Sequence, residues 1–442
     1  MIRGYPSADC LDVLFVTYGG GHVQMVLPVA KRLQERGQGV SIFALTTAIA
    51  SVETSGVPFF TYADLPQFAD PVIRACGERL EADLPANGVL PAIETQAYLG
   101  LNYRDLERTF GIDEAAALWA ARGRQVFQPF PTMREILSDL RPALVVATNS
   151  PRSEKAAIEA ATDLEIPAVV MVDMFALQEI KWLARPDFGH HLFVLDESVR
   201  QHMIEHGRPE NDVTVTGNPS FDALMEPQVI SAGHALRAAR GWGTEGRIVL
   251  LYASTPEPAL HPFTGEVANP GLPRAVEEEL RRIVAADPRF ELVIRRHPSE
   301  DQSVAVADRI TQSVRSEGVS VVINAVDVVV VTCSTVGLQA YLAGVPVVSV
   351  EGSVFTKDAP YAEYGMATPV AELADLRDTL VDIAVRRDVT NKSFPASATP
   401  SSATLRISDA ILDRLQKGSV PTGSDRVSND SLKAPAECGT PR

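Results

Sequence analysis

Short runs of valine, isoleucine and leucine alternate along this chain with longer segments in which apolar residues recur at helical spacing. Runs that are apolar at consecutive positions are typical of strands buried on both faces, as in parallel sheets covered by helices. The runs that we interpret as strands are 11–18, 40–45, 143–148, 167–173, 191–196, 212–217, 247–254, 291–296, 319–325, 327–332 and 345–350. This alternation predicts an α/β fold with parallel sheets.

The length of the chain, 442 residues, exceeds what one hydrophobic core ordinarily serves and predicts two domains. We expect a first Rossmann-like domain over 1–188, with a helical insertion at about 65–130 where no strand pattern occurs. A second Rossmann-like domain is expected over 189–395, followed by a C-terminal helix over 396–417. The tail 418–442 is rich in Ser, Pro and Gly with few apolar residues, a composition typical of disorder.

Charge and composition exclude several classes of function. The formal net charge of −16 argues against a nucleic-acid partner or an anionic membrane surface. No apolar run approaches the roughly 20 residues of a membrane span, and the N-terminus has no signal-peptide core. The scattered cysteines lack metal-ligand spacing and suit a reducing compartment. We therefore expect a cytoplasmic protein with no metal site, and the sequence leaves the oligomeric state open.

The stretch "YGGGHVQM" places three glycines and His22 between the first strand and an amphipathic helix. The glycines Gly19–Gly21 allow a tight turn in which backbone N–H groups, such as those of Gly20 and Gly21, can approach a ligand. The G-x-G-x-x-G spacing of a dinucleotide site is absent. A helix N-terminus disfavours positive charge, which favours a neutral His22 imidazole that can accept a proton. The structural alternative is a glycine turn with a capping histidine.

Polar residues also follow two later strands of the first domain. Asn149 and Ser150, after Thr148, stand where a strand meets a helix and could bind a sugar or a phosphate. Simple capping of a helix, with Ser150 as N-cap and Pro151 as its first residue, explains them equally well. Asp173 ends another strand and could orient or activate a hydroxyl group, or serve a structural role.

Two arginines and a histidine follow the strand 291–296. Arg295, Arg296 and His297 could neutralise a diphosphate there, although the alternation of a strand sends only one arginine toward the ligand.

A short helix follows the strand 327–332. The hydroxyls of Ser334 and Thr335, with the free N–H groups at this helix start, form a site of the kind that phosphates use. Other polar candidates at strand ends are Gly217, Asn218, Ser254 and Thr255.

Together these elements resemble the GT-B superfamily, in which two Rossmann-like, doubly wound domains face a central cleft. The stretch "GGGHVQMVLPVAKRL" is similar to the "GH…P…A..L" signature of family-1-type inverting glycosyltransferases. In those enzymes the histidine is the general base that deprotonates the acceptor hydroxyl, and His22 is the matching position.

Other motifs resemble UDP-N-acetylglucosamine 2-epimerases and related capsule and glycerophosphate polymer enzymes. The matching stretches are Thr148-Asn149-Ser150, Ile166-Pro167 with Asp173, "VTGNPSFDAL" (215–224), His297-Pro298 and Ser334-Thr335-Val336-Gly337. The epimerases begin with a "GTRPE" loop that supplies an arginine, whereas this chain has "YGGGHVQM". Gln339 stands where many GT-B enzymes place a glutamate on the nucleotide ribose.

The resemblance implies an inverting, metal-independent glycosyltransferase of polysaccharide biosynthesis. It would use a nucleotide-diphosphate sugar, with a UDP-sugar expected, and no cofactor. The implied catalytic residues are His22 and Asp173. The implied donor-binding residues are Gly217, Asn218, Ser254, Thr255, Arg295, His297, Ser334, Thr335, Gly337 and Gln339. The implied acceptor-binding residues are Gly20, Gly21, Asn149 and Ser150. The alternatives are a UDP-sugar 2-epimerase or hydrolase that uses Asp173, or a non-catalytic GT-B subunit.

Overall fold

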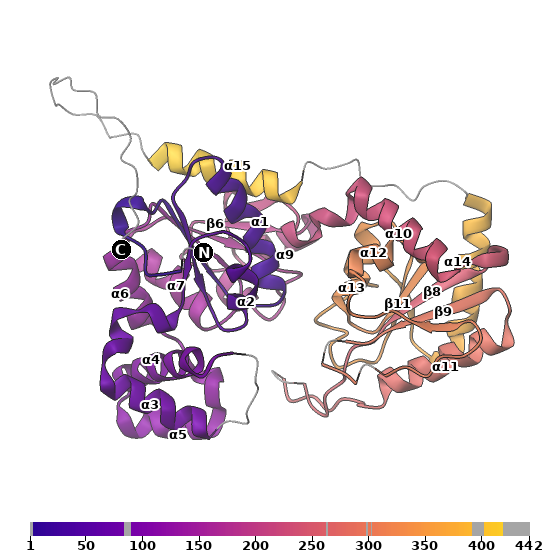
Figure 1. The fold of residues 1–442 in the computed structure, drawn as a ribbon, viewed down its shortest axis with the longest axis horizontal. Coiled ribbons are helices and arrows are strands. Elements are labelled where there is room, and N and C mark those ends of the chain that lie inside the picture. Colours follow the sequence, from indigo (N-terminus) through magenta and orange to yellow (C-terminus); the bar gives the residue numbers. More distant parts are fainter. Residues whose placement is uncertain are drawn as a thin grey trace. The chain divides into compact units, whose positions relative to one another are not determined.

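The computed structural model describes residues 3–83, 90–261, 264–297, 299–301, 303–390 and 402–418. These residues form two compact units, each built around one parallel sheet (Figure 1). Unit 1 comprises the described residues up to Ser220 and those from 402 onward, and unit 2 comprises those from Phe221 to 390.

Unit 1 contains a seven-stranded sheet in the order β3-β2-β1-β4-β5-β6-β7. All its strand pairs are parallel. Its strands are β1 (Val13–Thr17), β2 (Val40–Ala44), β3 (Phe59–Phe60), β4 (Leu144–Thr148), β5 (Ala168–Met171), β6 (His191–Val194) and β7 (Val213–Val215). Its helices are α1 (Gly21–Glu35), α2 (Ala48–Glu53), α3 (Pro71–Ala82), α4 (Ala92–Phe110), α5 (Ile112–Arg122), α6 (Phe130–Leu140), α7 (Ser153–Asp163), α8 (Ile180–Leu183), α9 (Glu197–Glu205) and α15 (Ala403–Gly418).

Unit 2 contains a six-stranded parallel sheet in the order β10-β9-β8-β11-β12-β13. Its strands are β8 (Ile248–Ala253), β9 (Phe290–Arg295), β10 (Ile310–Gln312), β11 (Val328–Val331), β12 (Val347–Val350) and β13 (Thr368–Val370). Its helices are α10 (Pro227–Arg240), α11 (Leu272–Ala286), α12 (Val319–Ile323), α13 (Thr335–Leu342) and α14 (Leu376–Thr390).

The helix α1 illustrates how the sequence pattern produces these layers. Val23, Val26, Ala30 and Leu33 recur at helical spacing, and all are buried against the first sheet in one hydrophobic core. Just beyond the helix end, Gly37 adopts a left-handed backbone with φ of 83°, a conformation that glycine takes without steric cost. The segment between β3 and β4 contains α3, α4 and α5, which form the helical layer below the sheet in Figure 1.

The boundary between the units lies later than the sequence predicted. The strands β6 and β7 were assigned to the second domain, but β6 pairs with β5, and β7 with β6, in the first sheet. Apolar periodicity identifies a buried strand but does not reveal which sheet it joins, because that depends on pairing with distant segments. The chain enters unit 2 at Phe221 rather than at residue 189.

The C-terminal helix α15 returns to unit 1. Its residues Ile407, Ile411 and Leu412 belong to the core that α1 and the first sheet share. The C-terminal helix expected over 396–417 is present as α15, and what the sequence did not predict is its packing against α1 in unit 1. The expected disordered tail lies outside the described residues beyond Gly418.

Two local expectations are also wrong. The run 319–325 was expected to be a strand, but residues 319–323 form the short helix α12, because four to eight apolar residues suit either structure. The helix α7 begins at Ser153 rather than Pro151, because Arg152 has a left-handed φ of 69° that interrupts the helical backbone.

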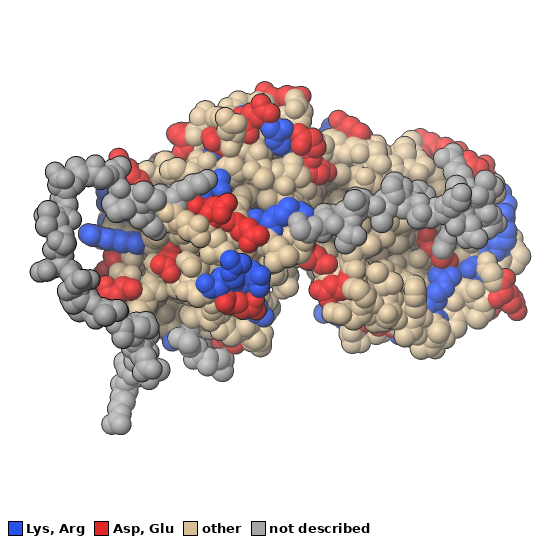
Figure 2. All heavy atoms as spheres, turned by 90° about the horizontal axis from the view of Figure 1, so that it is seen from above, with Lys and Arg blue, Asp and Glu red and all other residues tan. Residues whose placement is uncertain are grey.

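No helix within the described ranges is long and apolar enough to cross a membrane. On the face drawn in Figure 2, basic side chains are interspersed with acidic ones and no basic area extends across the surface.

We predict that Ile411→Ala weakens unit 1 selectively. Ile411 is fully buried in the core shared with α1, and truncating such a side chain costs about 2–5 kcal/mol. Amide hydrogen exchange checks this, because protection of β1, β2 and β4 should fall while that of β8 and β11 stays unchanged. Leu405→Ala, on an exposed position of the same helix, is the control and should change protection little. Equal loss of protection in both sheets would contradict the assignment of α15 to unit 1.

Candidate functional site

Each sheet contains a point at which the strand order reverses. In unit 1 it lies between β1 and β4, and in unit 2 between β8 and β11. At such a point the connections leave the sheet on opposite sides, and ligands of parallel sheets bind beyond the carboxyl ends of the strands. His22 and Asn149 follow β1 and β4, whereas Thr255 and Ser334 follow β8 and β11. These four sequence candidates therefore lie at the switch points of the two sheets.

The three glycines after β1 have different physical roles. A Cβ on Gly19 would lie 2.1 Å from Thr47 Oγ1 and 2.8 Å from the Thr47 carbonyl carbon, so the turn packs too closely for a side chain. Gly20 has a positive φ of 70° and precedes α1 as its N-cap. A Cβ on Gly21 would lie 3.4 Å from Asp173 Oδ2, which places this carboxylate beside the start of α1.

His22 is held by a chain of hydrogen bonds that begins at a buried carboxylate. Its Nδ1 lies 2.7 Å from Thr148 Oγ1, and the Thr148 hydroxyl in turn hydrogen-bonds Glu154 Oε2. A carboxylate only accepts, so the single hydroxyl proton of Thr148 goes to Glu154, and Thr148 Oγ1 accepts the Nδ1–H of His22. This network assigns the proton of a neutral imidazole to Nδ1 and leaves Nε2 with the lone pair.

The Glu154 carboxylate is completely buried and accepts three hydrogen bonds from two strand ends. It accepts the backbone N–H of Tyr18 at 2.6 Å, at the end of β1, and that of Ser150 at 3.1 Å, after β4. Its third donor is the hydroxyl of Thr148. Because Glu154 lies in the first turn of α7, it ties the ends of β1 and β4 to one helix. Ser150, expected as a helix cap, contributes its N–H to this carboxylate instead.

Asp173 lies close to His22 and is held from two sides. Its backbone N–H donates to Asn149 Oδ1 at 2.7 Å, and its Oδ1 accepts from Asn218 Nδ2 at 3.0 Å. Burial raises the pKa of the Asp173 carboxyl above its usual value, and the charge of His22 and the Asn218 hydrogen bond offset part of this rise. The structure thus brings the two expected catalytic residues together with Asn149 of the expected acceptor set.

Gly217 and Asn218 lie in unit 1, although the sequence placed them with the donor-binding residues of the second domain. They follow β7, which belongs to the first sheet because it pairs with β6. Gly217 has a positive φ of 79°, and the N–H and hydroxyl of Ser220 both donate to Asn218 Oδ1. This turn aims the Asn218 amide at Asp173.

In unit 2, the two residues after β8 differ in their surroundings. The buried hydroxyl of Ser254 donates to Glu300 Oε1 at 2.8 Å. Thr255 Oγ1 is buried and, within the described part of the chain, has no hydrogen-bond partner. A buried hydroxyl without a partner is costly, so Thr255 is the better candidate for a ligand contact.

The arginines at the end of β9 are engaged by protein groups. Arg295 Nη1 donates to Ser313 Oγ at 2.8 Å and to the carbonyls of Val314 and Glu317 at 3.3 and 3.0 Å. Burial lowers the pKa of the Arg295 guanidinium. Arg296 pairs with Glu277 of α11 at 2.6 Å. The two arginine side chains point in different directions, as the alternation of a strand predicts. Arg295 connects β9 to the loop 313–317, and Arg296 connects it to the helix α11.

His297 is exposed and closes a small turn. Its Nδ1 accepts the backbone N–H of Ser299 at 3.2 Å, and its own N–H donates to Glu300 Oε2 at 2.7 Å. A neutral His297 therefore carries its proton on Nε2. The same Glu300 also accepts from Ser254, so the ends of β8 and β9 are joined through one carboxylate.

The start of α13 has the geometry expected of a capped helix. Ser334 is its N-cap, with Oγ accepting from the N–H of Val336 at 3.3 Å, and Thr335 is exposed beside it. A Cβ on Gly337 would lie 2.9 Å from Val331, so this glycine lets the helix pack closely on β11. Gln339 Oε1 is buried and lacks a hydrogen-bond partner among the described residues, as Thr255 Oγ1 does.

In the described ranges, no group of three or more His, Cys, Asp or Glu side chains is placed to hold a metal ion.

Sequence reasoning missed the residue that organises the first switch point. Glu154 reads in the sequence as an ordinary acidic residue in the first turn of a helix, a common pairing with the helix dipole. Thr148 was noted only as a polar residue at a strand end. A carboxylate four residues after Ser150 was the available signal, but its partners come from β1 and β4 and are not adjacent in sequence.

Comparisons with known proteins give matches in structure only. No family model matches the sequence, and no curated protein matches it. The UDP-GlcNAc 2-epimerase from Neisseria meningitidis, solved bound to UDP-GlcNAc, matches with a TM-score of 0.56 and 14% identity, over 91% of this chain and 99% of that one. CalG4, the calicheamicin glycosyltransferase, matches with a TM-score of 0.55 and 16% identity, over 93% and 100%.

A glycosyltransferase of kitacinnamycin also matches, with a TM-score of 0.51 and 14% identity, over 91% of this chain and 98% of that one. Identities this low establish the fold and leave the activity open. The two parallel sheets and these matches together confirm the expected fold class: this chain is a two-domain, Rossmann-like protein of the GT-B fold.

Proposed function

We propose that this protein is an inverting, metal-independent glycosyltransferase that moves a sugar from a nucleotide-diphosphate donor, a UDP-sugar, to an acceptor hydroxyl. The observation that carries the proposal is the hydrogen-bond chain Glu154–Thr148–His22. It holds the imidazole at the tip of α1 in the tautomer whose Nε2 can take a proton. A general base positioned in this way is what transfer to a hydroxyl requires.

In the proposed step, His22 Nε2 takes the proton of the acceptor hydroxyl as its oxygen attacks the anomeric carbon. The bond between that carbon and the diphosphate oxygen breaks, and the nucleoside diphosphate leaves with the bonding electrons. The imidazolium that forms is stabilised by Asp173, whose carboxyl lies close enough to interact electrostatically with His22. The nearby acid favours the protonated imidazole, while the Thr148 bond keeps the ring oriented.

Unit 2 is proposed to bind the donor. The N–H groups at the start of α13, with the Ser334 and Thr335 hydroxyls, suit the charge that grows on the leaving diphosphate. The unpartnered oxygens of Thr255 and Gln339 would gain hydrogen bonds from a nucleotide sugar, and an amide oxygen can accept from a ribose hydroxyl. We propose that the Nε2–H of His297 donates a hydrogen bond to the donor. The contacts of Arg295 favour a supporting role at this strand end.

We predict that His22→Ala lowers kcat by a factor of about 10²–10⁴ with the affinity for the nucleotide sugar unchanged, because it removes the proton acceptor. Steady-state kinetics with a donor and acceptor pair that turns over provide the measurement. His206→Ala, at an exposed histidine beyond α9 in the same unit, is the matched control. An unchanged kcat in His22→Ala would remove the base assignment.

Thr148→Val tests the chain itself within the same experiment. Valine keeps the shape of threonine but removes the hydroxyl that joins His22 to Glu154, so kcat should fall by roughly 10- to 100-fold. Thr162→Val removes a hydroxyl that only bonds a carbonyl within α7 and should leave kcat unchanged.

Asp173 supports a second candidate, a UDP-sugar 2-epimerase or hydrolase on the same fold. A carboxyl whose pKa is raised by burial holds a proton more readily than an exposed carboxyl does, which suits acid–base chemistry on a sugar. The missing arginine loop after β1 and the orientation of His22 favour transfer over this alternative.

The two candidates predict different behaviour without an acceptor. A glycosyltransferase should leave UDP-GlcNAc and UDP-glucose intact in the absence of an acceptor hydroxyl other than water. Proton NMR of each UDP-sugar with the protein alone provides the measurement. Rapid conversion to a C2 epimer or to free UDP, abolished by Asp173→Asn, would establish the second candidate instead.

We also predict a pH signature for Asp173. Its pKa is higher in the folded protein than in the unfolded chain, so the folded protein binds the proton more tightly. Stability therefore falls as pH rises from the unfolded pKa, about 3.9, through the raised folded pKa. Thermal melts across pH should show this loss in the wild type and a smaller one in Asp173→Asn. Parallel stability profiles of the two proteins would show that Asp173 titrates normally.

A further inference from the structure

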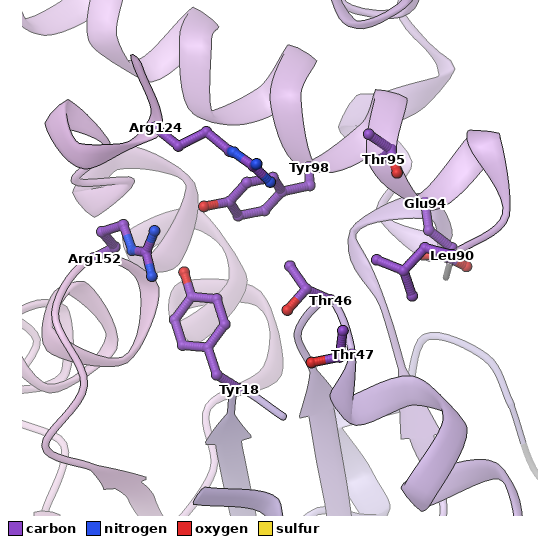
Figure 3. A pocket seen from close by; sticks show the side chains of 9 residues that line it. All are labelled: Tyr18, Thr46, Thr47, Leu90, Glu94, Thr95, Tyr98, Arg124 and Arg152. Carbon is purple, nitrogen blue, oxygen red and sulfur yellow. The ribbon is translucent and has the colours of Figure 1, made fainter. Parts of the chain in front are cut away.

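A pocket of 180 Å³ lies within unit 1 beside the first switch point (Figure 3). Its walls come from the end of β1, the loop after β2, the helix α4 and the segments that precede α6 and α7. Drug-sized ligands usually occupy about 300–1,000 Å³, so this pocket suits a single group of a larger ligand. Neither the proposed base nor the donor-side residues line it, so it is a separate feature of the site.

The pocket shares its anchor with the proposed base. Tyr18 forms one wall, and its N–H donates to the same Glu154 carboxylate that accepts from Thr148, the partner of His22. The Tyr18 hydroxyl is fixed by a 2.8 Å bond to Ser153, the residue next to Glu154. A group bound here therefore lies at the strand end from which the glycine turn leads to His22.

Two arginines reach this pocket, Arg124 from the turn Gly123–Val126 and Arg152 from the start of α7. Figure 3 shows Arg152 extending toward the Tyr18 ring and Arg124 extending beside Tyr98. The Arg152 guanidinium lies over the Tyr18 ring at 5.1 Å, and its buried Nε has no hydrogen-bond partner among the described residues. In the part of the chain that the structure describes, neither Arg124 nor Arg152 forms a salt bridge with a carboxylate.

The carboxylate in the pocket wall has a partner outside the pocket. Glu94 is buried and pairs with Arg3 at 2.5 Å, and Arg3 also contacts Asp64. Glu94 is thus engaged by Arg3 and not by the two pocket arginines, in a chain whose net charge is −16. Arg152 is half-buried and Arg124 is exposed, and the planar donors of both guanidinium groups suit a carboxylate or a phosphate.

We propose that this pocket binds the acceptor of the transfer reaction through an anionic group, a carboxylate or a phosphate, held by Arg152 and Arg124. The inference rests on the proposed function, and it names the class of acceptor: a negatively charged glycan or glycoside. The rings of Tyr18 and Tyr98 provide the apolar faces against which a sugar or a small ring packs. The acceptor then has to reach out of the pocket to His22, which lies beyond the glycine turn after Tyr18.

Three hexoses that differ in charge at one position test the proposal: glucose, glucuronate and glucose 6-phosphate. Isothermal titration of the full chain should show binding of at least one of the two anions and much weaker binding of glucose. Arg152→Gln and Arg124→Gln should each weaken binding of that anion roughly tenfold or more, the effect of losing a charge-assisted hydrogen bond. Arg134→Gln, at an exposed arginine of α6 paired with Asp163, is the control and should bind as the wild type does.

Arg152→Gly guards against misfolding as the cause of lost binding. Arg152 has a φ of 69°, which glycine adopts without strain, so this variant should fold and still lose the anion. Equal affinity for glucose and for both anions, or anion binding that survives in all three arginine variants, would overturn the proposal. Displacement of the bound anion by UDP would also overturn it, because the pocket would then bind the donor.

Transfer assays distinguish a failure of this inference from a failure of the proposed function. With a UDP-sugar donor, transfer to the anionic acceptor should fall in Arg152→Gln through a raised KM. Transfer to neutral acceptors alone, at the same rate in wild type and variant, would overturn the pocket assignment and leave the glycosyltransferase proposal standing. Arginine-dependent anion binding without transfer from any UDP-sugar donor would show an anion-binding pocket but would contradict both the glycosyltransferase and the acceptor role of the pocket.

Discussion

The buried carboxylate of Glu154 is the interaction on which the arrangement of the first switch point depends. It accepts N–H groups from the ends of β1 and β4 and the hydroxyl that orients His22. A fully buried carboxylate is tolerated only where its oxygens are satisfied, so these donors and the acid stabilise one another. One residue thereby couples the packing of α7 against the sheet to the proton that the His22 imidazole carries.

A second carboxylate, Asp173, extends this network across the sheet. Its contacts come from Asn149 after β4 and from Asn218 after β7. Burial raises the pKa of the Asp173 carboxyl, and the charge of the neighbouring His22 offsets part of this rise. Asp173 and His22 lie close enough to interact electrostatically. In the transfer that we propose, His22 takes up the proton of the acceptor hydroxyl beside this carboxyl. In an epimerase or hydrolase, Asp173 itself would be the acid–base group.

Much of the fold was predictable from the sequence, because buried parallel strands and amphipathic helices leave local patterns. The strands β1, β4, β8 and β11 and the helix α1 were all expected near their observed positions. The allocation of β6 and β7 to the first sheet and the return of α15 to unit 1 were not, because both depend on pairing between distant segments. The strand expected at 319–325 failed for a different reason, since a short apolar run suits a helix as well as a strand.

The sequence by itself determined the class of fold and placed chemically capable residues at the strand ends, because periodicity and turn chemistry are local properties. It identified His22, Asp173 and the start of α13 in this way. Only the tertiary structure decided which of those residues meet. The tertiary structure connects His22 through Thr148 to Glu154 and places Asn218 beside Asp173. It also pairs Arg295 and Arg296 with protein groups. Finally, it places Arg124 and Arg152 in the wall of one pocket. Hydrogen bonding and ion pairing act over a few ångströms in space, and residues far apart in the chain reach that distance only when the sheets have formed.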